Sequence, residues 1–193
     1  MRKRLTSEER KRIIQVKAME IFLEKGYRNT TMQDIVKASG LSIGGLYHHY
    51  KKTSEILYDI MVLGCEYRFN EIDKQVEIQS GNLTEELMAK IIVDKCLDDN
   101  KYMPIYVMLL QEIQDNDELR DLYIGMKEFN VKKIQSMLKL AGYQELSRDR
   151  YNYLTDMINS IILACGLLGI RESFNTNRYL LEEMFLSLLK KEE

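Results

Sequence analysis

The sequence predicts an all-α protein, and two observations carry that prediction. The chain has 193 residues, of which 45% are apolar, with one proline and ten glycines, so little interrupts a helix. Its apolar residues recur at helical spacing, without the sustained alternation of half-buried strands. We therefore expect an N-terminal three-helix helix-turn-helix head and a larger helical body.

The first helix should begin after Thr6 or Ser7, where Ser7 can cap it, and should end at Gly26. Its buried stripe is expected from residues spaced i, i+4, i+7 and i+8, which are Ile14, Ala18, Ile21 and Phe22. This is the spacing of a helix that covers one small core.

Two short helices should follow. Thr31 is placed to cap the first of them, with Asp34 three residues later in a capping-box position, and Gly40 closes it. Ser42 is placed to cap the second, which runs through about His49. Two short helices joined by a tight turn, behind a longer helix, are typical of a helix-turn-helix whose last helix reads DNA.

We divide the chain into a helix-turn-helix head at residues 1–52 and a helical body at residues 53–193. A linking helix should run over about residues 53–79, and the clearest break is "QSGNLT". Further helices are expected at about residues 84–99, 104–114, 117–140, 148–173 and 178–191.

Charge is divided unevenly between these parts. Residues 1–52 hold 12 Lys and Arg against 5 Asp and Glu, whereas the remainder holds 16 against 25. A basic head on an acidic body indicates a polyanionic partner for the head. Membrane surface is the rival polyanion, but the early apolar residues are too sparse for the broad face of an interfacial helix.

The head resembles the DNA-binding domain of the TetR family of bacterial transcription regulators. The resemblance covers residues 8–60 and rests on "AMEIFLEKGYRNTTMQDIVKASGLSIGGLYHHYKKTSEIL", whose helix, Gly-Tyr, Thr-Thr, Leu-Ser and Leu-Tyr elements follow the family's spacing. The body resembles the family only in length and helicity. The family implies a homodimer that binds a near-palindromic operator in double-stranded DNA, and an effector in the body that alters the separation of the two reading helices.

The same resemblance implies phosphate contacts from Thr31, Tyr47 and Lys51, with Leu46 and Tyr50 packed inward. The candidate DNA-binding residues are Thr31, Gln33, Ser42, Ile43, Gly44, Gly45, Tyr47, His48, His49, Lys51 and Lys52. The segment "RKR" at residues 2–4 either enters a minor groove or is a solubilising tail.

The stretch "SIGGLYHH" contains poor helix formers. Gly44 and Gly45 weaken this short helix by about 2 kcal/mol, and we expect them to let its backbone approach DNA while Ile43 touches thymine methyl groups. His48 and His49 lie about 100° apart on a helix, so they cannot share one metal or substrate. Each either contacts DNA, with affinity rising as pH falls through about 6.5, or is a solvated or packed imidazole.

The last two long helices carry more apolar surface than a lone helix pair should expose, which predicts a dimer interface. The alternative is an intrachain core, and Gly166 and Gly169 allow close helix approach in either case. The expected interface residues are Tyr151, Leu154, Ile158, Ile161, Ile162, Cys165, Leu168, Leu181, Met184, Phe185 and Leu188.

Methionines and tyrosines between residues 61 and 141 suit a small apolar or amphipathic effector, although such a stripe is also typical of an ordinary core. The candidate ligand-binding residues are Met61, Cys65, Met88, Ile92, Tyr102, Met103, Tyr106, Met108, Leu109, Tyr123 and Phe129.

No motif predicts catalysis, a cofactor or a metal site. There is no phosphate-binding glycine loop, and both histidines lie in the reading helix, away from any nucleophile. The three cysteines are expected to be reduced core residues. No apolar run is long enough to span a membrane, so we expect a cytoplasmic protein.

These observations predict a ligand-responsive, sequence-specific transcription regulator, and a repressor in particular. An alternative is motivated by Ile43 and Gly45, which replace residues that are usually polar in the family. In that alternative the DNA-binding head is vestigial, and the body is a small-molecule-binding or protein-interaction module.

Overall fold

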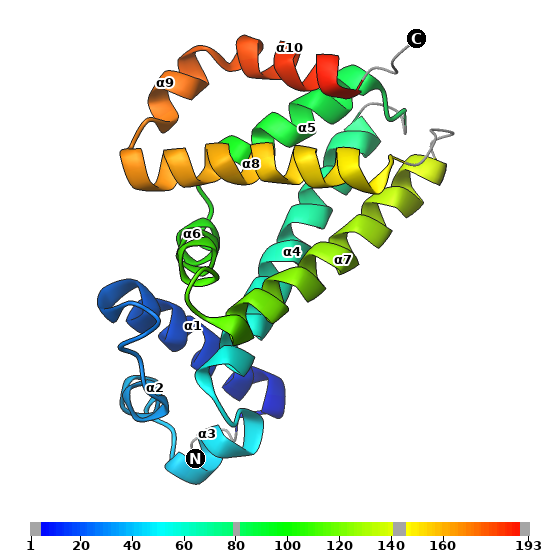
Figure 1. Cartoon of the computed structure of the whole chain (residues 1–193). Helices are drawn as coiled ribbons and strands as arrows, with labels where there is room; N and C mark the ends of the chain where they lie inside the picture. The colour runs from blue at the N-terminus through cyan, green and yellow to red at the C-terminus, as the bar shows by residue number, and fades with distance from the viewer. Residues whose placement is uncertain (1–4, 79–81, 141–145, 190–193) are drawn as a thin grey trace.

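The computed structural model describes residues 5–78, 82–140 and 146–189, and every regular element in those ranges is an α-helix. The all-α prediction is therefore confirmed. Figure 1 shows a small head of three helices from which one long helix rises into the larger body. The "RKR" arm and the first three residues of "QSGNLT" lie outside the described residues.

The head contains α1 (Ser7–Lys25), α2 (Met32–Ser39) and α3 (Ile43–His49). Thr6, and not Ser7, caps α1, because its hydroxyl accepts from the Glu9 amide while the Glu9 carboxylate accepts from the Thr6 amide. The expected capping box of Thr31 and Asp34 is present on α2, and Gly40 ends that helix in the left-handed conformation with φ of 66°.

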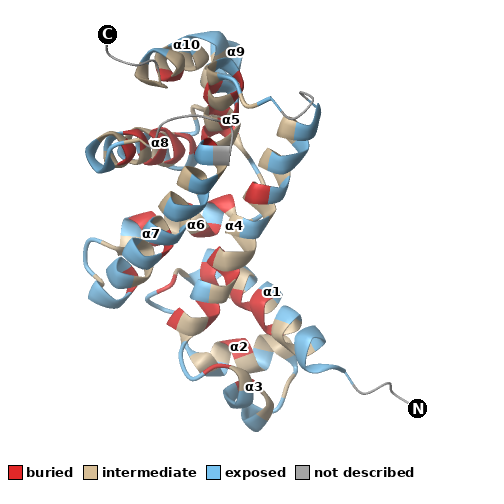
Figure 2. Ribbon diagram, turned by 90° about the vertical axis from the view of Figure 1, so that its right-hand side faces the viewer, coloured by how far each residue is buried: buried red, intermediate tan, exposed pale blue. Residues whose placement is uncertain are grey.

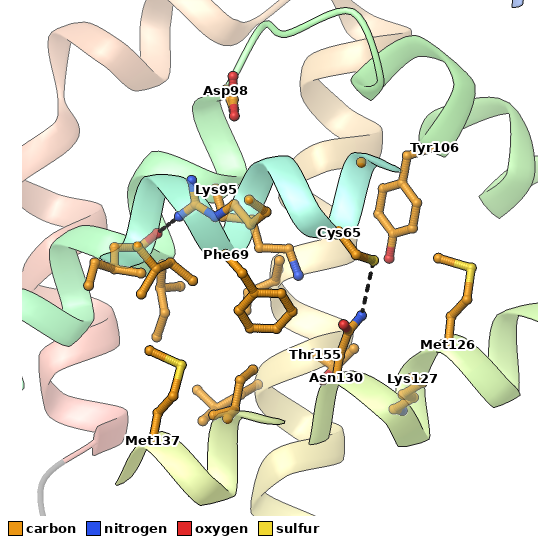
Figure 3. Close-up of a pocket in the computed structure, with 18 of the residues that line it drawn as sticks. Cys65, Phe69, Lys95, Asp98, Tyr106, Met126, Lys127, Asn130, Met137 and Thr155 are labelled. Carbon is orange, nitrogen blue, oxygen red and sulfur yellow. Dashed lines mark hydrogen bonds between the residues drawn. The ribbon is translucent and has the colours of Figure 1, made fainter. Parts of the chain in front are cut away.

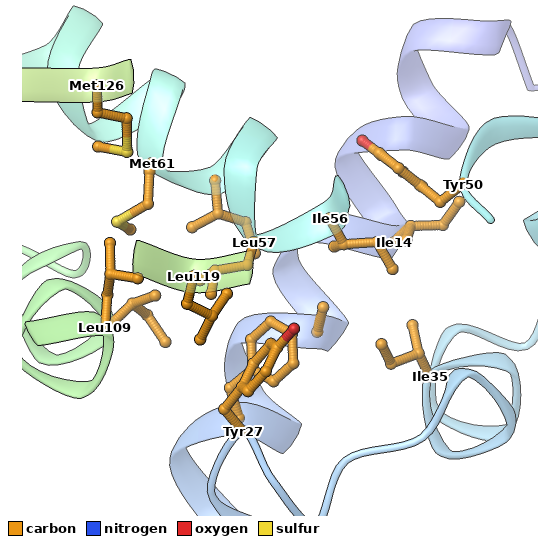
Figure 4. Close-up of a cluster of buried hydrophobic side chains, with 14 of the residues drawn as sticks. Ile14, Tyr27, Ile35, Tyr50, Ile56, Leu57, Met61, Leu109, Leu119 and Met126 are labelled. Carbon is orange, nitrogen blue, oxygen red and sulfur yellow. The ribbon is translucent and has the colours of Figure 1, made fainter. Parts of the chain in front are cut away.

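The head does not have a core of its own. α4 (Thr53–Ile78) runs from the head into the body, and its buried side chains join the head to α6 (Met103–Glu112) and α7 (Asp117–Leu140). One continuous cluster contains Ile14, Ala18, Phe22, Tyr27, Ile35, Leu46, Tyr50, Ile56, Leu57, Ile60, Met61, Ile105, Leu109, Leu119 and Met126 (Figure 4). Packing therefore ties the orientation of the reading helix to helices of the body.

A second core lies at the far end of the body. It is formed by α5 (Glu85–Leu97), α8 (Arg148–Leu168) and α10 (Arg178–Leu189), with α6 beneath it (Figure 1). α8 crosses α6 closely at Gly166, where an added Cβ would lie 2.7 Å from Cγ2 of Val107. The close approach expected of Gly166 is thus present.

The expected single helix over residues 148–173 is divided in two. Gly169 adopts φ of 66°, which ends α8, and the short helix α9 (Arg171–Thr176) follows in another direction (Figure 1). Helical periodicity continues through this region, so only the left-handed glycine marks the break.

Seven of the residues expected at the dimer interface are buried inside the single chain. Six of them belong to the second core, Leu154, Ile158, Ile161, Ile162, Cys165 and Phe185, and Tyr151 lines the cavity described below. An apolar stripe shows that a helix needs a partner, but not whether the partner belongs to the same chain. Leu168 is 70% exposed, and Leu181, Met184 and Leu188 are half-buried (Figure 2).

Candidate nucleic-acid interface and internal cavity

The exposed edge of the head is formed by α3 and the start of α2. Nine of the residues predicted to bind DNA are exposed: Thr31, Gln33, Ser42, Ile43, Gly44, Tyr47, His48, Lys51 and Lys52. Ile43 is 63% exposed at the first turn of α3, so most of its apolar side chain is open to contact with another molecule. The Thr31 hydroxyl is already engaged by the Asp34 carboxylate at 2.7 Å.

The two glycines of α3 have different surroundings. A Cβ at Gly44 would meet no atom within 4 Å, whereas a Cβ at Gly45 would lie 3.1 Å from the Ser42 hydroxyl oxygen. That oxygen caps α3 by accepting from the Gly45 amide, at 3.1 Å. A side chain at position 45 would crowd the Ser42 cap, whereas a side chain at position 44 would enter open space.

The far end of α3 is fixed by Tyr50. Leu46 and Tyr50 are buried, as the family resemblance implied. The Tyr50 hydroxyl donates to Asp59 Oδ2 at 2.8 Å and accepts from the Gln15 amide at 3.0 Å, so it joins α1 to α4. Burial, and then the hydrogen bond with Asp59, raise the pKa of Tyr50, which keeps the hydroxyl a donor at neutral pH.

The two lysines after α3 have partners within the chain. Lys51 donates to the carbonyl of Tyr47, and Lys52 forms an ion pair with Glu118 at the start of α7. Glu118 also accepts from the Ser54 hydroxyl at 2.7 Å. The bonds from Lys52 and then Ser54 lower the pKa of Glu118. Lys52 therefore links the head to the body here, instead of standing free for a phosphate.

The adjacent histidines are not equivalent. His48 is exposed, whereas Nε2 of His49 is enclosed and has no hydrogen-bond partner among the described residues. Burial, and then the neighbouring His48, lower the pKa of His49. Of the two, only His48 presents its ring on the exposed edge.

The body contains a partly open cavity of about 240 Å³ between α4, α5, α6, α7 and α8 (Figure 3). Eight of the eleven residues predicted to bind a ligand line it: Met61, Cys65, Met88, Ile92, Tyr102, Met103, Tyr106 and Tyr123. The other three do not. Leu109 is fully buried in the core shared with the head, Met108 packs against that core, and Phe129 is 60% exposed on α7. Leu109 lies in the shared core and Phe129 on the outer face of α7, so neither side chain lines the cavity.

One wall of the cavity is held by a chain of hydrogen bonds. The Tyr106 hydroxyl donates to Asn159 Oδ1 at 2.9 Å, and Asn159 Nδ2 donates to the Tyr123 hydroxyl at 2.8 Å. Burial raises the pKa of both tyrosines. Three helices are therefore joined at this wall by neutral polar groups whose partners are supplied internally.

The polar and charged side chains that line the cavity are not among the ligand-binding residues predicted from the sequence. Arg68, Lys95 and Asn130 all line it, and the amide of Asn130 donates to Cys65 Sγ at 3.7 Å (Figure 3). A signal was available, because Lys95 continues the apolar stripe of Met88 and Ile92 at i, i+4 and i+7. A lysine on a buried stripe indicates a special environment.

No group of three or more His, Cys, Asp or Glu residues that could hold a metal ion occurs in the part of the chain that the structure describes. The helices of that part are also too short or too polar to cross a membrane. The structure therefore has the exposed helix α3 in the head and a cavity in the body, with one hydrophobic core between them.

An exposed helix-turn-helix on a helical body with an internal cavity defines a DNA-binding protein of the helix-turn-helix class. Residues 14–60 match the family described as "Bacterial regulatory proteins, tetR family". The match covers α2, α3, most of α1 and the first turns of α4, which is the part of the chain that contains the helix-turn-helix.

Two curated relatives agree with that assignment. The HTH-type regulator YfiR of Bacillus subtilis is 38% identical over 63 residues, which are 33% of this chain and 31% of YfiR. The negative regulator IcaR of the biofilm operon icaADBC in Staphylococcus epidermidis is 27% identical over 86% of this chain and 85% of IcaR. The similarity to YfiR is thus confined to one third of the chain.

Among solved structures, NalD of Pseudomonas aeruginosa, a secondary repressor of the MexAB-OprM multidrug efflux pump, has the same fold. Its TM-score is 0.70, over 96% of this chain and 98% of NalD, at 17% sequence identity. Head and body therefore share one known arrangement of helices.

Proposed function

We propose that this protein is a ligand-responsive repressor that binds a near-palindromic operator as a homodimer. The observation that carries the proposal is the double position of Met61 and Met126. Both side chains line the cavity, and both belong to the core that holds the head. A molecule that fills the cavity as far as Met61 and Met126 would repack these two residues, and the repacking would reach the core that holds α3.

The DNA-binding part of the proposal rests on the exposed edge of α3. Ile43, Tyr47 and His48 project from one short helix, while Leu46 and Tyr50 fasten it to the head. An apolar side chain at the leading edge suits contact with thymine methyl groups in the major groove. Tyr47 supplies a hydroxyl on a rigid ring for a phosphate.

The dimer would use exposed apolar residues of α8 and α10. Leu167 and Leu168 lie at the end of α8, Tyr179 and Leu180 lie at the start of α10, and Tyr153 lies near the start of α8; each is at least half exposed. Exposed apolar side chains in such number are typical of a surface that another chain covers. It replaces the inward-facing residues expected from the sequence.

We infer repression, and not activation, from the descriptions of similar proteins. IcaR is described as a negative regulator, and NalD as a repressor. A repressor bound at an operator would be released when an effector repacks the cavity, because the two reading helices would no longer match successive major grooves.

The test is to select fragments of the source genome with the purified full chain, and then to titrate an enriched fragment at several salt concentrations. We expect a near-palindromic sequence, dimeric stoichiometry and a steep decrease of affinity with salt. Weak retention without sequence preference would instead support the alternative of a vestigial head on a ligand-binding body.

A further inference from the structure

The cavity contains two cationic side chains with no carboxylate partner. Lys95 makes no hydrogen bond and no ion pair with any residue that the structure describes, and its ammonium points into the cavity beside Phe69 (Figure 3). Arg68 lines the same wall and donates to the carbonyl of Ile91, while its Nε has no partner in the described part of the chain. Buried cations without counter-charges are costly, so something must compensate.

The acidic residues nearby favour the charge of Arg68 from a distance, but none of those described forms an ion pair with Arg68 or Lys95. Asp98 lines the cavity, but its carboxylate accepts from the backbone and side-chain amides of Asn100, at 3.0 and 2.7 Å. Asp94 is engaged by Gln75 and Arg178. The third cation of the lining, Lys127, lies 3.9 Å from Asp156 and so has its own partner. Lys95 and Arg68 remain the unpaired charges of this cavity.

The surroundings of Lys95 are otherwise apolar. Phe69, Ile72, Met88, Ile92 and Met137 line the same space. Burial, and then the Arg68 guanidinium, lower the pKa of Lys95, which is the expected response of an ammonium that faces another cation in an apolar setting. An anion placed between the two would favour the charged form of Lys95 and would satisfy free donors of both side chains.

We propose that the effector is an amphipathic organic anion, a carboxylate on an apolar chain, whose charged end lies between Lys95 and Arg68. Its apolar chain would extend along Phe69 towards Met137. The volume of about 240 Å³ lies below the range of about 300–1,000 Å³ that is usual for drug-sized ligands, so a short or medium chain fits best. Asn130 Nδ2 donates to Cys65, and its Oδ1 has no partner among the described residues; rotation of this amide by about 180° would exchange the two and turn a donor towards the anion. This inference rests on the proposed function, in which the cavity receives the effector.

The test compares probes that share an apolar chain and differ only in charge. Hexanoate, octanoate and decanoate would be titrated into the full chain by calorimetry, beside the matching alcohols and alkyltrimethylammonium ions. We expect at least one carboxylate to bind about tenfold or more tighter than its alcohol, with no measurable binding of the cation. Equal binding of carboxylate and alcohol, or no binding of any carboxylate, would overturn the inference.

A substitution of Lys95 tests whether this residue is the source of the preference for carboxylate over alcohol. Lys95→Met keeps the length of the side chain and removes the charge, so the preference for carboxylate over alcohol should fall about tenfold or more while the alcohol binds at least as well. Lys90→Met is the matched control, because Lys90 is exposed on the same helix. An unchanged carboxylate preference in a folded Lys95→Met protein would contradict the assignment.

DNA binding separates this inference from the function on which it rests. If octanoate binds through Lys95 and also releases the operator fragment, both stand. If octanoate binds through Lys95 but leaves operator affinity unchanged, the ligand class stands and the proposed regulation by ligand fails.

Discussion

The Arg28 guanidinium lies 2.6 Å from Glu112 and 2.7 Å from Asp115, which joins the loop after α1 to the end of α6. The hydrogen bonds that Arg28 donates to Asp115 and then to Glu112 raise the pKa of its guanidinium. Together with Lys52 and Glu118, this link forms a polar rim around the core that head and body share.

Arg28→Gln should separate ligand response from DNA binding. The side chain is exposed, so we expect little change in stability and in basal operator affinity. The ratio of operator affinities with and without effector should shrink, because the head would follow the body less closely. Fluorescence anisotropy with labelled operator measures that ratio. Lys17→Gln is the control, since the Lys17 and Glu20 pair lies within α1; an equal loss in both variants would refute the coupling role.

Ile43→Ala should change base preference at one position of each half-site, because the side chain is exposed at the leading edge of α3 and can only make apolar contacts. Tyr47→Ala should weaken binding to all sequences alike, as expected for a phosphate contact. Sequencing of fragments selected by each variant checks both results. An unchanged base profile for Ile43→Ala would remove the role given to this residue.

His49→Gln should make stability less sensitive to acid. The pKa of His49 is lowered in the folded chain, so below about pH 6.5 the unfolded chain binds more protons, and the free energy of unfolding falls as pH falls. Above that pH the contribution of His49 is fully present. Urea unfolding at stepped pH values measures the slope. A slope for His49→Gln that runs parallel to the wild-type slope would contradict the prediction.

Leu168→Arg should shift the protein towards monomers and weaken operator binding by the loss of the second reading helix. Leu168 is 70% exposed, so a charge there should leave the fold intact. Sedimentation equilibrium gives the association state. Phe129→Arg changes a similarly exposed apolar residue on α7, away from the proposed interface. A wild-type dimer in Leu168→Arg would place the interface elsewhere.

Much of the head could be predicted because its signals are local. The capping box of Thr31 and Asp34, the glycine at position 40 and the Ser42 cap act within a few residues, so sequence alone reveals them. The burial of Ile158 and Ile161 depends instead on α5, which is far away in the chain, and periodicity cannot identify that partner. The sequence places Lys95 on an apolar stripe of α5, but only the fold shows that none of the described acidic residues forms an ion pair with it.

The continuous core from Ile14 to Met126 also limits how this protein can be recombined. A head cut at residue 52 and fused to a foreign body would leave Phe22 and Tyr27 without the α4, α6 and α7 side chains that cover them here. Chimeras made for biosensors should therefore carry the head together with the first turns of α4, and their new body must offer apolar residues in place of Ile105, Leu109 and Leu119. In this chain the exposed helix α3 and the cavity of the body therefore belong to one structural unit that must be transferred whole.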